Sequence, residues 1–346
     1  MTRTIRIGNV SIGGGNPVRI QSMTNTYTHD ADATVRQIHM LEEEGCEIIR
    51  LAVPDERAAR ALSQIKKQVS IPMVADIHFD HRLALIAIDE GIDALRLNPG
   101  NIKKRENVEE TVRKAAAANI PIRIGVNAGS IDRMKHPHPT PEALVESAMS
   151  HVAILEALDF FDIKVSLKAY DIPTTVNAYR LFSQQRDYPL HIGITEAGDV
   201  FKGAIRSAVG IGVLLFEGLG DTVRVSLTGD PVEEVKAAKE ILTALNNRSF
   251  GVDIISCPTC GRTEIPLEEM VTTIRNALSD IKKPLKIAVM GCVVNGPGEA
   301  RDADLGIAGG KGEGIIFVKG KVIGKYSQAE LVPEFIKQVR LYADSI

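Results

Sequence analysis

Residues 46–77 contain the pattern that decides the fold: CEIIRLAV (46–53), DERAARALSQIKKQ (55–68) and PMVADI (72–77) follow one another. The first and third runs are short and rich in aliphatic and β-branched residues, which is typical of buried strands. The run between them has apolar residues at helical spacing. The stretch therefore predicts a strand, a helix and a second strand, the unit from which parallel sheets are built.

The same unit recurs from Pro17 to Asn247. The predicted strands are PVRIQS (17–22), CEIIRLAV (46–53), PMVADI (72–77), ALRLN (94–98), PIRIGV (121–126), DIKVSL (162–167), PLHIGIT (189–195) and TVRVSL (222–227). Eight strand–helix units in succession predict an α/β fold of the (β/α)₈ TIM-barrel type. A doubly wound sheet is the alternative, although it rarely needs eight such even units. Residues 1–13 are expected to form a small hairpin.

The regular alternation of predicted strands and helices ends after Asn247. We expect a smaller α+β domain there, with a helix over 267–279, a strand over 286–291, strands and tight turns across the glycine-rich tract 305–324, and a closing helix over 329–343. The predicted domains are therefore 1–248 and 249–346, joined by no more than a few residues.

Composition excludes several classes of protein. The net charge is −3 over 346 residues, whereas nucleic-acid-binding proteins normally present a strongly basic face. No apolar run approaches the ~20 residues that span a bilayer, and the amino terminus has no apolar core of the signal-peptide kind. We therefore expect a cytoplasmic protein that binds neither nucleic acid nor membrane. In that compartment a Cys-x-x-Cys pair indicates metal or redox chemistry more often than a disulfide.

Polar and charged side chains stand at the carboxyl ends of the predicted strands, where barrel enzymes carry their catalytic groups. Four of them are arginines, although buried parallel strands normally consist of Val, Ile and Leu. The arginines could form salt bridges within the barrel, but a convergent set favours a small substrate with several negative charges, and a diphosphate fits best. The candidate substrate-binding residues are Arg50, Asp76, His78, Arg96, Asn98, Arg123, Asn127, Ser166, Lys168, Thr195, Arg224 and Ser226.

Two acidic positions near the strand ends leave alternatives open. The cluster of Asp76, His78 and Asp80 could bind a divalent metal, but no second histidine pair appears at another strand end, so hydrogen bonding to substrate or arginine is preferred. Glu196 is the acidic residue at the end of the seventh strand. It can serve as a counter-ion for a neighbouring cation or as a catalytic proton donor or acceptor.

Three of the four cysteines lie in SCPTCGR (256–262) and GCVVNGPGE (291–299), and no histidine follows His191. Structural zinc needs four Cys or His ligands, and this domain supplies three. Three thiolates with one labile position suit a catalytic [4Fe-4S] cluster, with Glu299 as a displaceable oxygen ligand. Cys46 lies in a predicted barrel strand and is expected in the core. A zinc-stabilised barrel enzyme acting on a phosphorylated metabolite stays open as the alternative.

Beyond these spacings, several motifs resemble those of the hydroxymethylbutenyl diphosphate synthase family, the iron–sulfur oxidoreductases of the methylerythritol phosphate route to isoprenoids. The motifs are SCPTCGR, GCVVNGPGEA, GGKGEGIIFVKG (309–320), SMTNT (22–26), RLNPGN (96–101), RIGVNAGS (123–130), GITEAG (193–198) and RVSLTGDP (224–231). The length matches the bacterial two-domain form of the family.

The resemblance implies the cofactor, the reaction and the donor. A [4Fe-4S] cluster would be held by Cys257, Cys260, Cys292 and Glu299, with Glu196 as the proton source. The implied reaction is the reductive ring opening of 2-C-methyl-D-erythritol 2,4-cyclodiphosphate to 4-hydroxy-3-methylbut-2-enyl diphosphate and water. Flavodoxin or ferredoxin would supply the electrons.

The direction of the last barrel helix predicts an assembly. A helix over 231–247 runs antiparallel to the strands and, at ~1.5 Å per residue, carries the chain roughly 25 Å away from the barrel mouth. A linker of a few residues cannot return the cysteines to that mouth. We therefore expect a head-to-tail homodimer in which each active site contains residues of both chains.

Overall fold

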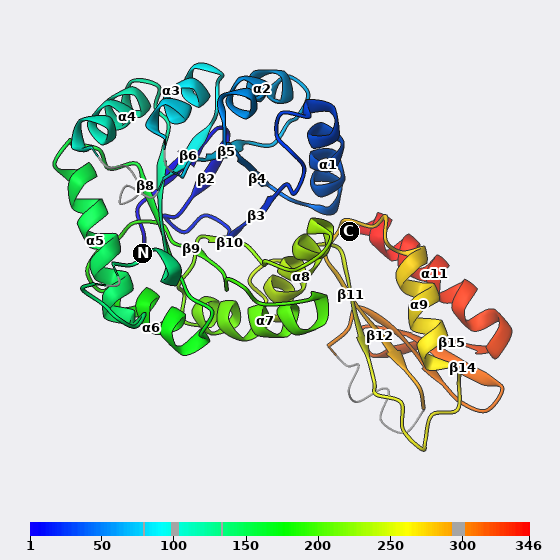
Figure 1. Cartoon of the computed structure of the whole chain (residues 1–346). Helices are drawn as coiled ribbons and strands as arrows, with labels where there is room; N and C mark the ends of the chain where they lie inside the picture. Colours follow the sequence, from blue (N-terminus) through cyan, green and yellow to red (C-terminus); the bar gives the residue numbers. More distant parts are fainter. Residues whose placement is uncertain (79, 98–103, 133, 293–301) are drawn as a thin grey trace. The chain divides into compact units, whose positions relative to one another are not determined.

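The computed structural model describes residues 1–78, 80–97, 104–132, 134–292 and 302–346. The chain divides into two compact units, which we call the barrel unit (Met1–Arg248) and the second unit (Ser249–Ile346). Figure 1 shows both, and each is described by itself. In the part of the chain that is described, no helix is both long enough and apolar enough to cross a membrane.

The barrel unit is a parallel eight-stranded barrel ringed by helices (Figure 1). Its strands are β3 (Arg19–Met23), β4 (Ile48–Ala52), β5 (Met73–Asp76), β6 (Ala94–Leu97), β7 (Ile122–Asn127), β8 (Ile163–Lys168), β9 (His191–Ile192) and β10 (Thr222–Val223). Its helices are α1 (Ala31–Glu44), α2 (Glu56–Lys66), α3 (His81–Asp89), α4 (Arg105–Ala117), α5 (Pro141–Glu156), α6 (Ile172–Ser183), α7 (Val200–Phe216) and α8 (Pro231–Ala244). The hydrogen-bonded order runs from β8 through β7, β6, β5, β4, β3 and β10 to β9, and a bridge from Val165 to Leu190 closes the ring. The expected TIM barrel is confirmed.

Local sequence explains where the helices begin. Asp55, Asp171 and Asp230 each precede a barrel helix, and each carboxylate accepts a hydrogen bond from a backbone amide in the first turn. Such N-caps satisfy amides that have no partner within the helix. The caps therefore start α2 and α6 close behind the preceding strands, at Glu56 after Ala52 and at Ile172 after Lys168.

Strands β9 and β10 are shorter than the runs 189–195 and 222–227 predict, because each contains only two residues. The Arg224 amide still donates to the Ile192 carbonyl of β9 at 3.0 Å, but further along the chain the amides of Leu227 and Thr228 bond to other parts of the unit. The Leu227 amide donates to the Glu234 carboxylate at 3.0 Å, and the Thr228 amide donates to the Gly198 carbonyl at 2.9 Å. The strand ladder therefore ends early.

The amino-terminal end of the barrel is closed by the predicted hairpin, β1 (Ile5–Ile7) and β2 (Val10–Ile12). Its isoleucines pack against the first residues of the barrel strands, including Ile48 and Ala94. The unit also ends on this side. Arg248 donates to the Val18 carbonyl at 2.8 Å and to the Glu47 carboxylate at 2.6 Å, and both partners precede barrel strands.

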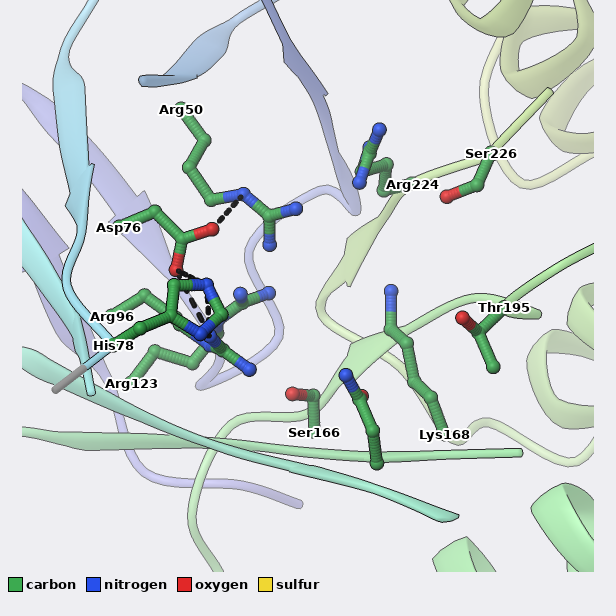
Figure 2. A pocket seen from close by; sticks show the side chains of 11 residues that line it. Arg50, Asp76, His78, Arg96, Arg123, Ser166, Lys168, Thr195, Arg224 and Ser226 are labelled. Atoms are coloured by element: carbon green, nitrogen blue, oxygen red, sulfur yellow. Dashed lines mark hydrogen bonds and ion pairs between the residues drawn. The ribbon is translucent and has the colours of Figure 1, made fainter. Parts of the chain in front are cut away.

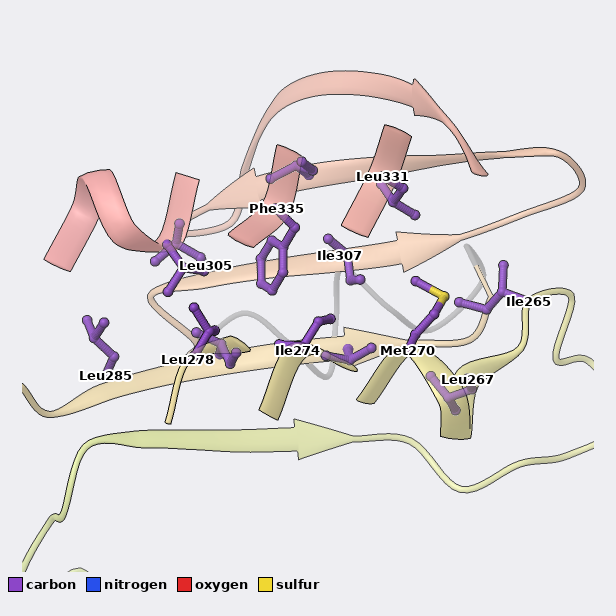
Figure 3. Packing of buried hydrophobic residues seen from close by; sticks show 14 of the residues in the cluster. Ile265, Leu267, Met270, Ile274, Leu278, Leu285, Leu305, Ile307, Leu331 and Phe335 are labelled. Carbon is purple, nitrogen blue, oxygen red and sulfur yellow. The ribbon is translucent and has the colours of Figure 1, made fainter. Parts of the chain in front are cut away.

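In its described residues, the second unit is a five-stranded mixed sheet with two helices on one face. Its elements are β11 (Val252–Ser256), α9 (Leu267–Ala277), β12 (Leu285–Met290), β13 (Leu305–Gly309), β14 (Glu313–Val318), β15 (Lys321–Ser327) and α11 (Gln328–Ser345). Strands β11, β12 and β13 are parallel, and β14 and β15 continue the sheet antiparallel. Figure 3 shows the core, where Met270 and Ile274 from α9 and Phe335 from α11 meet Leu305 and Ile307. β11 is not among the predicted strands.

Candidate functional site

The barrel mouth contains a cavity of about 190 Å³. Figure 2 shows the side chains of its lining directed into a common space. Eleven of the twelve predicted substrate-binding residues line it: Arg50, Asp76, His78, Arg96, Arg123, Asn127, Ser166, Lys168, Thr195, Arg224 and Ser226. The twelfth, Asn98, lies outside the described residues. The eleven come from β4 to β8 and from the segments that follow β5, β9 and β10, so the barrel gathers residues that are far apart in the sequence.

Asp76 is the carboxylate at the centre of one side of the cavity. Arg96 donates to it at 3.1 Å, and the Arg50 guanidinium lies 3.6 Å from it. His78 lies 3.6 Å from the same carboxylate and 3.0 Å from the Arg96 guanidinium. Burial raises the pKa of Asp76, but the positive charge of Arg50 and the contact with His78 outweigh it and hold the pKa well below its usual range. Asp76 is therefore an anion that orders the arginines.

Arg123 has no such partner among the described residues. The residue is 4% exposed, and its Nε and Nη1 atoms are buried without a hydrogen bond. Burial and the charges of Arg50 and Arg96 lower its pKa well below the ordinary value. A buried guanidinium with orphaned donors is costly in the empty barrel and is suited to a ligand with several oxygen acceptors.

Positive charge exceeds negative charge in this cavity. Its described lining contains four arginines and Lys168 against the single carboxylate of Asp76. Glu234 on α8 lies behind the lining, 3.4 Å from Arg224, and counting it still leaves an excess of three positive charges. Burial and neighbouring arginines lower the pKa of Lys168, and burial first of all lowers the pKa of Arg50 to about 10. The cavity is therefore built for an anion with several charges.

Glu234 is a site residue that the sequence reasoning missed. It is buried, and it accepts hydrogen bonds from the Ser22 hydroxyl at 3.2 Å and from Arg224. In the sequence it stands in the first turn of a helix beside Glu233, where acidic residues usually form a solvated face. The sequence pattern that could have indicated Glu234 is its position on the face of the helix that packs against the strands.

Glu196, the predicted proton donor, is exposed and is not among the residues that line the cavity. It directly follows Thr195, which does line it, and its backbone has a φ of 54°. A non-glycine residue in this left-handed conformation is uncommon and often marks a functional turn. The second predicted catalytic residue, Glu299, lies outside the described residues.

The cysteines gather at one edge of the second unit's sheet. Cys257 directly follows β11 and Cys292 follows β12 by one residue, and these strands are parallel neighbours with Ser256 paired to Val289. The Gly291 amide donates to the Cys257 sulfur at 3.2 Å. The SCPTCGR motif and the described Gly291 and Cys292 of the second motif therefore meet at the carboxyl ends of adjacent strands.

The chemistry of this cysteine edge suits a thiolate-bound cluster. Cys260 is exposed, and the backbone amide of Arg262 is the main cause of a lowered thiol pKa there. Amide donors to sulfur are typical of iron–sulfur sites. Among the described residues, no three His, Cys, Asp or Glu side chains are arranged around a single metal ion. The Gly291 amide beside the Cys257 sulfur and the lowered pKa of the Cys260 thiol are compatible with thiolate ligands of such a cluster.

Comparison with known proteins covers nearly the whole chain. Residues 2–239 match the family model of the GcpE TIM-barrel domain, and residues 253–341 match that of the GcpE protein C-terminal domain. A protein of Thermodesulfovibrio yellowstonii is 58% identical over 342 residues, covering 98% of each chain. One of Caldanaerobacter subterraneus is 56% identical, covering 98% of this chain and 96% of its own. Both are named 4-hydroxy-3-methylbut-2-en-1-yl diphosphate synthase (flavodoxin).

Solved structures show similarity of fold alone. The dihydropteroate synthase of Yersinia pestis aligns with a TM-score of 0.52 at 10% identity, covering 71% of this chain and 98% of its own. A sialic acid synthetase of Leptospira borgpetersenii aligns with a TM-score of 0.51 at 14% identity, covering 81% and 99%. At such identities the likeness extends to the fold and not to the chemistry.

Proposed function

The chain belongs to the GcpE family, and from this premise we propose that it converts 2-C-methyl-D-erythritol 2,4-cyclodiphosphate into 4-hydroxy-3-methylbut-2-enyl diphosphate. It is an oxidoreductase of isoprenoid biosynthesis, and its relatives are named 4-hydroxy-3-methylbut-2-en-1-yl diphosphate synthase (flavodoxin). The observation that carries the proposal is the cavity at the barrel mouth, with an excess of buried positive charge and Arg123 donors that have no partner among the described residues. A cyclic diphosphate offers several anionic oxygens to such a site.

Each group of residues has a distinct role in this proposal. Arg123 and its neighbouring arginines bind the diphosphate, while Asp76 and Glu234 hold two of those arginines in position. Glu196 gives a proton to the hydroxyl that leaves as water, from a turn next to the cavity. The backbone strain at Glu196 supports this role, since such strain is typical of functional turns.

Cys257, Cys260, Cys292 and Glu299 would hold the [4Fe-4S] cluster. When bound, such a cluster supplies single electrons for reductive cleavage of a C–O bond. The Gly291 amide donates a hydrogen bond to the Cys257 sulfur, and the Arg262 amide favours the thiolate of Cys260. The names of the relatives include flavodoxin, and we propose flavodoxin as the electron donor of this protein, with ferredoxin as a possible substitute. We also propose that the protein acts in the cytoplasm. The zinc-stabilised alternative is not favoured by these names.

We further propose that residues 1–248 bind the substrate, that residues 249–346 carry the cluster, and that each active site combines these parts from two subunits. Arg248 supports this arrangement, because its bonds to Val18 and Glu47 hold the chain at the amino-terminal end of the barrel. From there to Cys257 the chain is at most about 30 Å long when fully extended. To reach the mouth of the same barrel, this segment would have to run along the outside of the helices from the amino-terminal end of the barrel to the opposite end.

The deciding experiment is turnover after anaerobic reconstitution with iron and sulfide, using the cyclodiphosphate and reduced flavodoxin. We expect a brown protein that bleaches with dithionite and forms the linear diphosphate and water. A protein fully loaded with the cluster that binds the cyclodiphosphate but never opens it would overturn the proposal. Zinc in place of iron in the protein as isolated from iron-replete cells, with activity intact, would favour the alternative.

The fourth ligand needs its own variant. We expect Glu299→Gln to keep the three cysteines and the folded second unit, but to change the electron paramagnetic resonance spectrum of the reduced protein. Glu264→Gln is the matched control, since Glu264 is a described acidic residue next to Thr263 in the same cysteine region. Identical spectra for Glu299→Gln and the unmodified protein would remove Glu299 from the proposed ligand set.

A further inference from the structure

Met23 contacts one of the arginines of the substrate cavity through its sulfur atom. It is the last residue of β3, and in the register of the barrel it pairs with Arg50 on β4. The Arg50 Nε and Nη2 atoms donate to the Met23 Sδ atom at 3.1 and 2.9 Å. A thioether sulfur is only a weak acceptor. The closest partner that the described residues give Arg50 is therefore a neutral, polarisable group.

Two other arginines of the cavity have carboxylate partners. Asp76 accepts a hydrogen bond from Arg96 at 3.1 Å, and Glu234 lies 3.4 Å from Arg224. Arg50 lies farther from Asp76, at 3.6 Å. A carboxylate in contact with a guanidinium offsets its positive charge, whereas a thioether holds the guanidinium in place and leaves its charge intact. Arg50 therefore keeps both its charge and its donors for a ligand.

Oxidation changes the sulfur of Met23 as an acceptor. Hydrogen peroxide transfers one oxygen atom to the thioether, which is oxidised by two electrons to a sulfoxide, while the peroxide is reduced to water. The sulfoxide oxygen is polar and accepts hydrogen bonds from a guanidinium group far more strongly than the thioether sulfur does. The N–H groups that a phosphate oxygen needs are then already engaged.

We propose that Met23 is a modification site, at which oxidation to the sulfoxide engages Arg50 and weakens the binding of a diphosphate. In the reduced protein Met23 is a positioning residue, because its sulfur holds Arg50 beside the cavity without competing for its donors. In the oxidised protein the sulfoxide oxygen accepts from the Nε and Nη2 atoms. The chemical class of the ligand stays the same, and the number of donors that Arg50 offers to it falls.

Met23 is accessible to a small oxidant. It is partly exposed at the carboxyl end of its strand, whereas Met73, in the next strand but one, is 0% exposed. Its partner Arg50 lines the open cavity of the barrel mouth, so the opening that admits the substrate also admits peroxide. Methionine sulfoxide is returned to methionine by dedicated reductases. The modification is therefore reversible, as a switch requires.

This inference rests on the proposed function in one respect, since it takes the ligand of the cavity to be a diphosphate. Pyrophosphate supplies that chemistry without turnover, so its binding tests Met23 whatever reaction the protein catalyses. The full-length chain without the cluster is used for this measurement, because iron would react with the peroxide.

The first measurement is the affinity for pyrophosphate before and after treatment with hydrogen peroxide, by titration calorimetry. Mass spectrometry of peptides follows oxidation at Met23, with Met73 as the buried comparison, and thermal unfolding checks the fold. We expect the affinity to fall at least about tenfold as Met23 is oxidised, the value of a lost charge-assisted hydrogen bond. A methionine sulfoxide reductase with a thiol should restore it, which general damage to the fold would not allow.

Met23→Leu is the matched control, because it removes the sulfur and nearly conserves the volume. We expect it to bind pyrophosphate about two- to fivefold more weakly, since Arg50 loses its positioning contact, and peroxide to have no further effect. If peroxide weakens binding by Met23→Leu as much as by the unmodified protein, other side chains are responsible and the proposal is overturned. A Met23 sulfoxide that leaves the affinity unchanged overturns it as well.

Met23→Gln carries the test into the cluster-loaded enzyme, where no peroxide is needed. Its amide oxygen is a permanent strong acceptor on a side chain of similar length. We expect KM for the cyclodiphosphate to rise about tenfold and kcat to change less, because the amide competes with the substrate for Arg50. A KM equal to that of Met23→Leu would contradict the role of the acceptor. If the unmodified protein binds pyrophosphate but never opens the cyclodiphosphate, the proposed function fails, and the pyrophosphate measurements still decide the role of Met23.

Discussion

At the scale of single residues, the barrel mouth holds charges that their neighbours do not balance. Three arginines lie around Asp76, and one of them, Arg123, keeps two buried donors without a partner among the described residues. Such a site is expensive in the empty protein. These charged residues therefore favour substrate binding but lower the stability of the ligand-free protein. A single substitution at one of them can change the two properties in opposite directions.

Arg123→Met tests that separation. We expect kcat/KM for the cyclodiphosphate to fall about 10- to 150-fold, the value of a charge-assisted hydrogen bond. The free energy of unfolding of the ligand-free protein should not fall, and we expect it to rise by on the order of 1 kcal/mol because an unpaired buried charge disappears. Steady-state kinetics and thermal unfolding measure both. Arg60→Met, at an exposed position on α2, is the control, and equal losses in both variants would contradict the prediction.

Asp76 gives the stability of the protein a pH dependence. Its pKa lies well below the ordinary value of 3.8 in the folded state. The stabilisation that the Asp76 carboxylate gives the folded protein is therefore complete above the pKa of Asp76 in the unfolded chain. It is lost as the pH falls through the pKa of Asp76 in the folded protein. We expect Asp76→Asn to lower the free energy of unfolding by about 3–5 kcal/mol at neutral pH, since it leaves clustered arginines unpaired.

The difference between Asp76→Asn and the unmodified protein should shrink as the pH falls below about 4. Chemical denaturation at a series of pH values measures it. Pyrophosphate should raise the melting temperature of Asp76→Asn more than that of the unmodified protein, because the anion replaces the missing charge. A constant difference across acid pH would contradict the role of Asp76 as the anion that orders the arginines.

At the scale of elements, the short strands β9 and β10 meet closely. A Cβ atom at Gly193 would lie 2.3 Å from the Arg224 carbonyl oxygen and 2.7 Å from the Lys168 amine. Glycine is therefore required where the end of β9 passes the end of β10. The same contact sets the positions of two cations of the cavity, so packing between strands controls the geometry of the site.

Gly193→Ala should therefore impair binding without removing any group that contacts the ligand. We expect the free energy of unfolding to fall by about 1–3 kcal/mol, the usual cost of overpacking, and KM for the cyclodiphosphate to rise. Gly129→Ala, where an added Cβ meets nothing within 4 Å, is the control for stability. An unchanged KM in Gly193→Ala would show that Arg224 and Lys168 tolerate the shift.

At the scale of the whole molecule, the shared active site predicts complementation between two impaired proteins. Arg123→Met impairs the barrel, and Cys257→Ser impairs the cysteine edge. In a mixed dimer one site combines both defects, while the other combines two intact parts. After dissociation and reassembly of an equimolar mixture, we expect activity equivalent to about a quarter of the sites. Activity that never exceeds the mean of the two variants would place each site within one subunit.

The period of the strand–helix pattern was sufficient to predict the barrel, because eight buried strands with eight amphipathic helices have few other ways to bury their apolar faces. The positions of the polar residues at strand ends could also be predicted, since parallel strands in a barrel all end at one mouth. Eleven of the predicted residues line that mouth for this reason. The separation of the cysteine motifs was compatible with a common site, but their meeting depended on β11, which was not predicted.

What the sequence by itself determined is the set of chemical groups: the arginines of the strands, the three cysteines and the order of the elements. Only the tertiary structure decided which of these groups lack partners. The pairing of Arg224 with Glu234, and the isolation of the Arg123 donors among the described residues, depend on distances between elements far apart in the chain. The exposure of Phe201 and Phe216 on α7 is decided in the same way. A helix pattern states which residues are apolar, but the neighbours supplied by the fold determine which of its faces is covered.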